Sequence, residues 1–202
     1  MWGVTTLISG TSGVGKTSLA ISVCMAAMKQ NKRALFFTLE ESNPQLTRNM
    51  KSLGFDLESF EKKGLLKIIT SRPTALGIEA HLVTLYENIE SFRPDVVVLD
   101  PITDLIEVGT KKEVRGMLIR IIDHMKNKLM TIVFTALVNR GTDSPSVQMS
   151  SMVDNWIRLD TNSKEKENQP YITIVKTRGM DHARNSFLLK FSNEGLEIGE
   201  SI

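Results

Sequence analysis

Residues 10–17 read Gly-Thr-Ser-Gly-Val-Gly-Lys-Thr and match the pattern G-x-x-x-x-G-K-[ST] of a phosphate-binding loop. Glycines let successive backbone N–H groups wrap a triphosphate, and a helix that follows the loop directs its positive dipole end at the same anion. Lys16 is expected to reach the β- and γ-phosphates, and the hydroxyl of Thr17 to bind Mg²⁺. The predicted nucleotide-binding residues are Gly10, Thr11, Ser12, Gly13, Val14, Gly15, Lys16, Thr17 and Ser18.

The segments on either side of this loop predict an α/β fold with a mostly parallel sheet flanked by helices. Residues 4–8 are an apolar strand, and residues 18–28 have the pattern of a helix. Strands and helices then alternate, and the last third of the chain is mostly strand. We expect further strands at 33–39, 65–70, 95–100, 130–137, 156–159, 171–176, 187–191 and 196–198, and further helices at 43–53, 57–62, 78–89 and 114–125. Asn43 is expected to cap its helix, with Pro44 in the first position.

Composition sets limits on the kind of protein. A chain of 202 residues suits a single domain, here residues 1–202, and its net charge of +2 gives no electrostatic argument for nucleic acid. No apolar run approaches the length of a membrane span, so we expect no membrane partner. The single cysteine, Cys24, is expected in the core, and it favours a cytoplasmic location. His81 is expected to pack or to face solvent rather than to bind a metal.

Acidic residues follow two of the apolar strands. Asp100 ends the strand 95–100, where it could hold Mg²⁺ through water opposite Thr17, although a strand-end Asp also occurs without a metal. Glu40 and Glu41 end the strand 33–39. If that strand neighbours the loop strand, one of the two carboxylates faces the γ-phosphate and can orient or deprotonate the attacking group. The alternative is an acid pair that complements the dipole of the next helix.

Several longer stretches resemble the KaiC proteins, RecA-superfamily ATPases of the circadian clock and their non-clock relatives. The matching stretches are FFTLEES, VVVLDPITDL, SSMVDNWIRLD, KTRGMDH and FLLKFSNEGLEI, in the same order and spacing. The resemblance covers nearly the whole chain and implies a RecA-like P-loop NTPase fold. KaiC proteins typically carry two such domains in tandem, and this chain looks more like the second, autokinase domain.

The resemblance implies a set of site residues. ATP and Mg²⁺ are the expected cofactors, with Asp100 as the metal-associated acid and Glu40 and Glu41 as the catalytic pair. Lys176 and Arg178 match a Lys-x-Arg-Gly motif that reaches the γ-phosphate bound by the neighbouring subunit of a hexameric ring. Two cations that are two positions apart on a strand share one face and can clamp one phosphate, although a solvated strand face has the same pattern.

Autophosphorylation is a further implication of the resemblance. Ser150 and Ser151 stand where the autokinase domain carries its acceptor Ser and Thr. This chain departs from the family pattern in having Ser151 instead of Thr, and Val153 instead of the Thr before the acid. Serines that merely cap a helix or loop are the alternative.

The sequence thus predicts a Mg²⁺-dependent ATPase that assembles into rings. Two other functions remain open. One is a DNA-dependent recombinase or helicase of the same superfamily, for which the polar loop 139–148 offers only Arg140 as a cation. The other is a non-enzymatic module that uses ATP as an assembly ligand.

Overall fold

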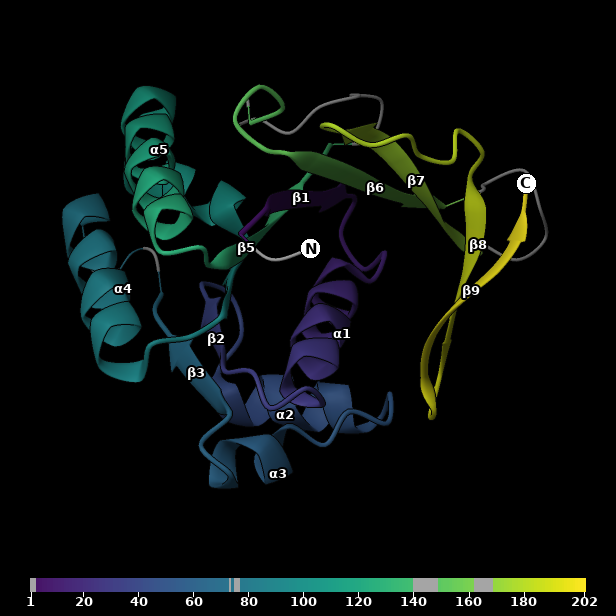
Figure 1. Ribbon diagram of the computed structural model, residues 1–202, viewed down its shortest axis with the longest axis horizontal. Coiled ribbons are helices and arrows are strands. Elements are labelled where there is room, and N and C mark those ends of the chain that lie inside the picture. The colour runs from purple at the N-terminus through teal and green to yellow at the C-terminus, as the bar shows by residue number, and fades with distance from the viewer. Residues whose placement is uncertain (1–2, 73, 75–76, 140–148, 162–168) are drawn as a thin grey trace.

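The computed structural model describes residues 3–72, 74, 77–139, 149–161 and 169–202, and these form a helix-flanked sheet (Figure 1). The sheet has nine strands among these residues, in the order β3-β2-β4-β5-β1-β6-β7-β8-β9. The strands are β1 (Thr5–Gly10), β2 (Ala34–Thr38), β3 (Leu66–Thr70), β4 (Val96–Asp100), β5 (Thr131–Leu137), β6 (Asn155–Thr161), β7 (Pro170–Thr177), β8 (Phe187–Ser192) and β9 (Gly195–Ser201). The helices are α1 (Lys16–Met28), α2 (Asn43–Lys51), α3 (Leu57–Lys62), α4 (Ile78–Phe92), α5 (Lys111–Asn127) and the 3₁₀ helix η2 (Ile102–Glu107).

Six neighbouring strands of the sheet run parallel, in the spatial order β3, β2, β4, β5, β1 and β6. Helices cover both faces of this part of the sheet. Alternate side chains of each strand therefore enter two different cores. Leu35 and Phe37 of β2 pack with α4 and α5, whereas Phe36 packs with α1, α2 and α3. Figure 1 shows these two helical layers on opposite sides of the sheet. The α/β fold with a mostly parallel sheet, predicted from the sequence, is confirmed.

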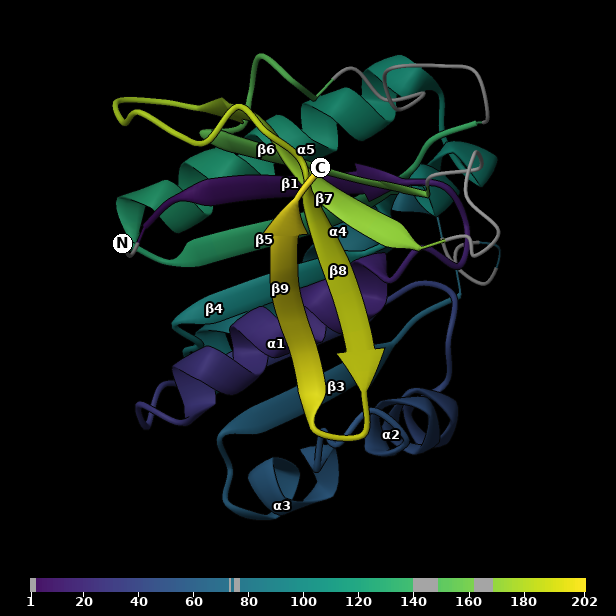
Figure 2. The ribbon, with the colours of Figure 1, turned by 90° about the vertical axis from the view of Figure 1, so that its right-hand side faces the viewer.

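The C-terminal third is mostly strand, as predicted, and beyond β6 its strands run antiparallel, which the sequence did not specify. Strands β7, β8 and β9 pair antiparallel, and the β8–β9 hairpin turns across the side of α1 (Figure 2). The tip of this hairpin lies against the turn after α2, because an added Cβ on Gly54 would come within 2.2 Å of the carbonyl oxygen of Asn193. The end of the chain is thereby packed onto the helical layer that contains α1.

Three local features differ from, or add to, the sequence-based expectations. η2 was not predicted, because its short apolar run has no helical period. Asn43 does not cap α2: the cap position is Ser42, and the amide of Asn43 instead donates to Glu61 of α3 at 3.1 Å. His81 is fully buried, with its Nδ1 3.0 Å from the hydroxyl of Ser71, so of the two expected alternatives, packing and solvent exposure, the structure shows packing.

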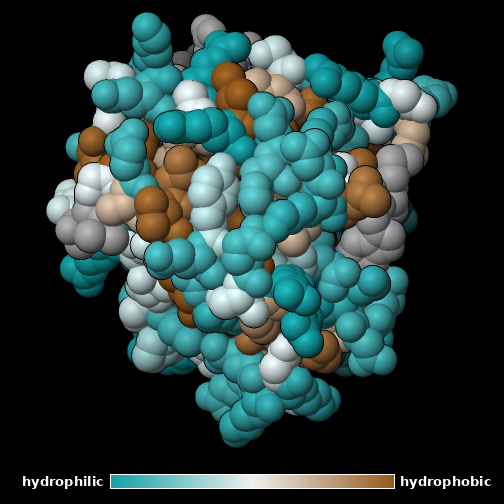
Figure 3. Space-filling view, turned by 60° about the vertical axis from the view of Figure 1, so that its left-hand side comes forward, coloured by the Kyte–Doolittle hydropathy of each residue, from teal (hydrophilic) through white to brown (hydrophobic). Residues whose placement is uncertain are grey.

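The surface and the interior follow the expected division of polarity. The face shown in Figure 3 is mostly hydrophilic, with hydrophobic residues in several separate groups. Cys24 is fully buried in α1, and burial raises the pKa of its thiol to about 12. In the part of the chain that the structure describes, no helix combines the length and the apolar character that crossing a membrane requires. Most of the predicted polar loop 139–148 lies outside the described residues, since the structure leaves out residues 140–148.

The docking of the β8–β9 hairpin predicts the outcome of a matched pair of substitutions. Gly54 and Gly64 both have positive φ, +77° and +68°, but an added Cβ meets a backbone carbonyl only at Gly54, since Gly64 has no atom within 4 Å. Gly64→Ala should therefore cost about 1 kcal/mol of unfolding free energy from backbone strain alone. Gly54→Ala should cost about 3 kcal/mol or more, because the hairpin must also move. Urea denaturation of the two variants measures the difference, and equal costs would contradict the docked position of the hairpin.

Candidate functional site

The predicted phosphate-binding loop joins β1 to α1 at the carboxyl edge of the parallel strands. It borders a cavity of about 420 Å³, as expected for a ligand site in an open α/β sheet. The cavity is lined by Ser12, Gly13, Gly15, Lys16, Thr17, Ser18, Glu40, Glu41, Asn49, Met50, Ser52, Leu53, Asp100, Pro101 and Leu137. Three predicted loop residues lie behind this surface. Gly10 ends β1, Thr11 supports Lys16 through its carbonyl, and Val14 is buried in the core with α1.

Two glycines of the loop are required by their surroundings. Gly15 is the cap residue of α1 with φ +98°, and an added Cβ would come within 2.1 Å of the ring of Phe191 in β8. An added Cβ on Gly10 would come within 2.4 Å of the carbonyl oxygen of Leu159 in β6. The cap residue Gly15 has no side chain to occupy the amide groups of the first turn of α1, so these groups and the helix dipole are directed at the cavity. The loop thus has the shape and polarity of an anion site.

The side chain of Lys16 folds back onto the phosphate loop. Its ammonium group donates to the carbonyl oxygen of Thr11 at 2.7 Å, and only 7% of the residue is exposed. Burial lowers the pKa of Lys16, and the negative charges of Asp100 and Glu40 act in the opposite direction. A bound phosphate would favour the charged form further, because it adds negative charge beside the ammonium group.

Asp100 and Thr17 lie side by side, as the sequence predicts for a magnesium site. The hydroxyl of Thr17 donates to Asp100 at 2.8 Å, and Thr135 of β5 donates to the other carboxylate oxygen. Burial raises the pKa of Asp100, and the two hydroxyl donors oppose that shift. One carboxylate and one hydroxyl beside a phosphate loop fit Mg²⁺, which usually takes few protein ligands together with phosphate oxygens and water.

Glu40 and Glu41 reach the cavity by a route that the sequence did not predict. The condition that β2 neighbours β1 is wrong, because β4 and β5 lie between them. The chain leaving β2 instead continues along the end of β4, where the N–H of Leu39 donates to the carbonyl of Asp100 at 2.8 Å. This turn brings both glutamates to the cavity wall, despite the intervening strands.

The two glutamates differ in their surroundings. Glu40 is exposed, and its charge acts on Lys16, Asp100 and Asp104. Glu41 accepts a hydrogen bond from the side chain of Asn49 in α2 at 3.0 Å. Glu40 therefore faces the phosphate loop and the acid of β4, whereas Glu41 joins its segment to α2.

Sequence reasoning missed several polar residues near the cavity, and two of them interact with the paired glutamates. Asn49 lines it from α2, and Asp104 stands in η2. Burial, together with Glu40, Glu107 and Asp100, raises the pKa of Asp104 to about 6. Asp104 could have been noticed in the sequence, since it follows Asp100 by four residues, but the helix η2 that holds it in its first turn was not predicted.

Four predicted residues lie outside this cavity. Lys176 pairs in register with Trp156, and Trp156 with Leu7, which precedes Gly10 by about 10 Å of strand. Lys176 and Arg178 are therefore at the amino edge of the sheet, opposite the phosphate loop. Ser150 and Ser151 are exposed beside them, and their carbonyl oxygens accept hydrogen bonds from Lys176 and Arg178, each at 2.6 Å.

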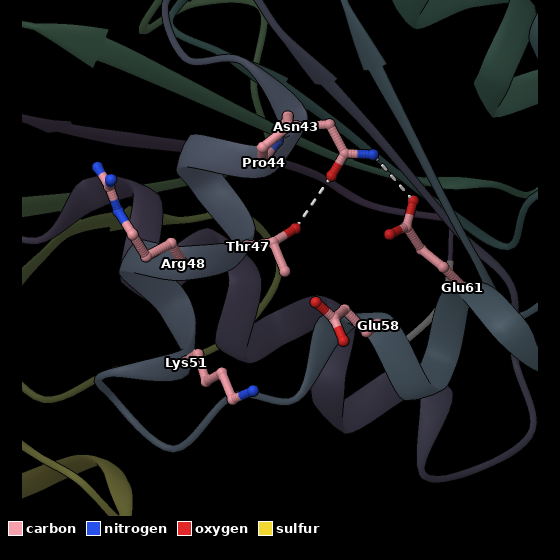
Figure 4. Close-up of a pocket in the computed structure, with 7 residues that line it drawn as sticks. All are labelled: Asn43, Pro44, Thr47, Arg48, Lys51, Glu58 and Glu61. Atoms are coloured by element: carbon pink, nitrogen blue, oxygen red, sulfur yellow. Dashed lines mark hydrogen bonds between the residues drawn. The ribbon is translucent and has the colours of Figure 1, made fainter.

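A second hollow, of about 510 Å³, lies between α2 and α3 (Figure 4). Hydrogen bonds from Thr47 to Asn43 and from Asn43 to Glu61 cross one side of it. None of its lining residues belongs to the phosphate loop, and it is separated from the nucleotide-sized cavity by α2. The chemistry expected from the sequence is thus concentrated at the first cavity.

Comparison with known proteins agrees with this geometry. A family model described as "ATPase: KaiC" matches residues 2–201. The circadian clock protein KaiC2 of Synechocystis sp. is 32% identical over 98% of this chain and 36% of its own length. The circadian clock oscillator protein KaiC of Parathermosynechococcus lividus is 31% identical over 96% of this chain and 37% of its own length. This chain spans little more than a third of the length of these relatives. It is a domain of the KaiC ATPase family.

Proposed function

We propose that this domain binds ATP with Mg²⁺ in the 420 Å³ cavity and hydrolyses the γ-phosphate. The observation that carries the proposal is that Lys16, Thr17, Asp100 and Glu40 all line this one cavity. A phosphate loop alone would account for the binding of a nucleotide but not for its hydrolysis. A carboxylate beside the loop adds what hydrolysis requires, a group that can orient or deprotonate water.

The residues of the chain have separate roles in this proposal. The amides of the loop and the first turn of α1 bind the phosphates, and Lys16 neutralises charge on the β- and γ-oxygens. Thr17 and Asp100 would hold Mg²⁺, which supplies positive charge to the phosphate oxygens when it is bound. Glu40 orients the attacking water and accepts its proton. Glu41 accepts a hydrogen bond from Asn49 and so fixes the turn after β2, which carries both glutamates, to α2.

The site is completed by a second copy of the chain. The sheet separates Lys176 and Arg178 from their own phosphate loop, because they lie at its amino edge. A head-to-tail interface brings the amino edge of one copy to the carboxyl edge of the next, and closure of such contacts produces a ring. The relatives' family suggests a hexamer, and the longer relatives suggest a tandem domain. A cytoplasmic location also stays a prediction.

Autophosphorylation of Ser150 or Ser151 is a second candidate function. Both serines are exposed in a turn, and the same two cations that are proposed to contact a neighbour's γ-phosphate bind their carbonyl groups. A hydroxyl in this position would lie near the phosphate that is to be transferred. A DNA-dependent ATPase stays an alternative, since residues 140–148 of the predicted loop 139–148 lie outside the described residues. A non-enzymatic assembly module is the other alternative, and ATP turnover decides between it and an ATPase.

The roles of the two glutamates predict unequal effects on turnover. Glu40→Gln should lower kcat for ATP hydrolysis by about 10²-fold or more and leave ATP binding intact, because it removes the base without changing the loop. Glu41→Gln is the matched control and should lower kcat much less. Lys16→Ala should weaken ATP binding by about 10–100-fold, as expected for a lost charged hydrogen bond. Steady-state phosphate release and binding of a fluorescent ATP analogue measure these effects. Equal losses in the two glutamine variants would contradict the assignment of Glu40.

Sharing of the site between copies predicts complementation. A Lys16→Ala chain and a Lys176→Ala/Arg178→Ala chain should each be nearly inactive alone. When they are mixed and assembled, some interfaces combine an intact loop with an intact cation pair, so a fraction of the activity should return. ATPase assays across mixing ratios measure this recovery, and activity that never exceeds the sum of the separate chains would show that each copy has its own complete site.

The kinase candidate predicts a covalent product. Incubation with Mg-ATP should add phosphate to Ser150 or Ser151, as read by intact mass and peptide mapping. Ser150→Ala/Ser151→Ala and Glu40→Gln should both abolish it. ATP hydrolysis with no phosphate on either serine would leave an ATPase without this kinase activity.

A further inference from the structure

Three cationic side chains from two parts of the fold surround one carboxylate at the amino edge of the sheet. The carboxylate is Asp154, just before β6. Lys126 at the end of α5 lies 2.9 Å from it, and Arg178, just after β7, lies 3.8 Å from it. The charge of Lys176 also interacts with Asp154. The cluster therefore contains more positive than negative charge.

Asp154 is fixed to the sheet by its own hydrogen bonds. Its carboxylate accepts the N–H of Thr5, the first residue of β1, at 2.9 Å, and its N–H donates to the carbonyl of Thr5 at 2.9 Å. Its carbonyl accepts the N–H of Arg178 at 2.9 Å. The carboxylate is only 19% exposed. Asp154 thus joins the strand that leads to the phosphate loop to the end of β7.

Lys176 and Arg178 are held in place by the segment that Asp154 ends. Lys176 donates to the carbonyl oxygens of Ser150 and Val153, at 2.6 and 2.7 Å, and Arg178 donates to that of Ser151 at 2.6 Å. The Arg178 side chain is still 51% exposed, so the pair presents positive charge outward. Neutral carbonyl groups do not compensate that charge, and the one carboxylate of Asp154 balances only part of the charge of three cations, which suits the pair to a phosphate from outside the chain.

Electrostatics make the cluster depend on Asp154. Burial and the neighbouring Arg178 lower the pKa of Lys176, and Asp154 acts against both. Burial acts to raise the pKa of Asp154, but the N–H of Thr5 and the cations Lys126 and Arg178 bring it below its ordinary value. Asp154 is therefore a negative charge that offsets the repulsion between two cations held close together.

We propose that Asp154 is the positioning residue of the phosphate contact that Lys176 and Arg178 make with a neighbouring copy. It fixes the backbone of Arg178, orients its guanidinium group and is itself anchored by Lys126. The inference rests on the proposed function, because the contact between copies is part of that proposal. Asp154 would act on catalysis only through Arg178 and Lys176, since the phosphate loop of its own chain lies at the opposite edge of the sheet.

The test compares Asp154→Asn with a matched acid at the same edge of the sheet. Asp95 also pairs with a lysine, Lys32 at 3.1 Å, and also accepts a backbone N–H, that of Arg33 at 2.9 Å, but it is remote from the cation pair. In assembled protein at saturating Mg-ATP, Asp154→Asn should lower kcat by about 10-fold, as expected when a charged contact is weakened. KM should change less than about twofold, because the chain's own loop is intact. Asp95→Asn should leave both parameters unchanged.

A double-mutant cycle decides whether Asp154 acts through Arg178. In an Arg178→Gln background, Asp154→Asn should produce no further loss of kcat beyond about twofold. Losses that multiply would overturn the inference, as would an Asp154→Asn protein whose kcat per folded chain equals that of the parent. If Asp154→Asn does not fold, Lys126→Met replaces it in the same cycle, with a smaller loss expected. If Arg178→Gln itself leaves kcat unchanged, the shared site fails instead, and with it the premise of this inference.

Discussion

The buried carboxylate of Asp100 is the interaction on which the arrangement of the site depends. An ionised carboxyl group with 5% exposure is costly unless donors surround it, and here the hydroxyl groups of Thr17 and Thr135 do so. These bonds join the first turn of α1 to β4 and β5, so the phosphate loop is held in a fixed place relative to the sheet. The same carboxylate faces Lys16, whose ammonium group is also buried. Two opposite charges, each with its own hydrogen-bond partners, thus lie close together where phosphate and metal are proposed to bind.

Much of this arrangement could be predicted from local pattern. The continuous burial of β4 follows from helices on both faces of the sheet, and the period-3.6 burial of α5 follows from its packing on one side. The helix Leu57–Lys62 was predicted with the bounds that the structure shows. The loop and Asp100 could be predicted because each has a fixed place relative to its own strand. The order of the strands could not, because pairing between β2 and β4 depends on contacts distant in sequence. The position of Glu40 depends on that order, which is why its predicted route was wrong although its place at the cavity was expected.

The two edges of the sheet have opposite electrostatic character in the residues described. Asp100, Asp104, Glu40 and Glu41 gather at the carboxyl edge, whereas Lys126, Lys176 and Arg178 gather at the amino edge around Asp154. Complementary edges favour head-to-tail association and disfavour the meeting of two like edges. Nucleotide phosphates would add further negative charge at the carboxyl edge, so under the proposed head-to-tail assembly bound ATP and a neighbouring copy would each strengthen the binding of the other.

The contact between Phe191 and Gly15 also has a consequence for synthesis of the chain. The loop lies near the start of the sequence, yet the ring that packs on it belongs to β8, close to the end. A nascent chain emerges from the ribosome N-terminus first, and domains fold as units once their residues are available. The phosphate loop is therefore complete only after β8, which follows it in the chain by more than 150 residues, has been translated. A truncated product that ends before β8 would carry the whole loop motif without the wall that shapes it.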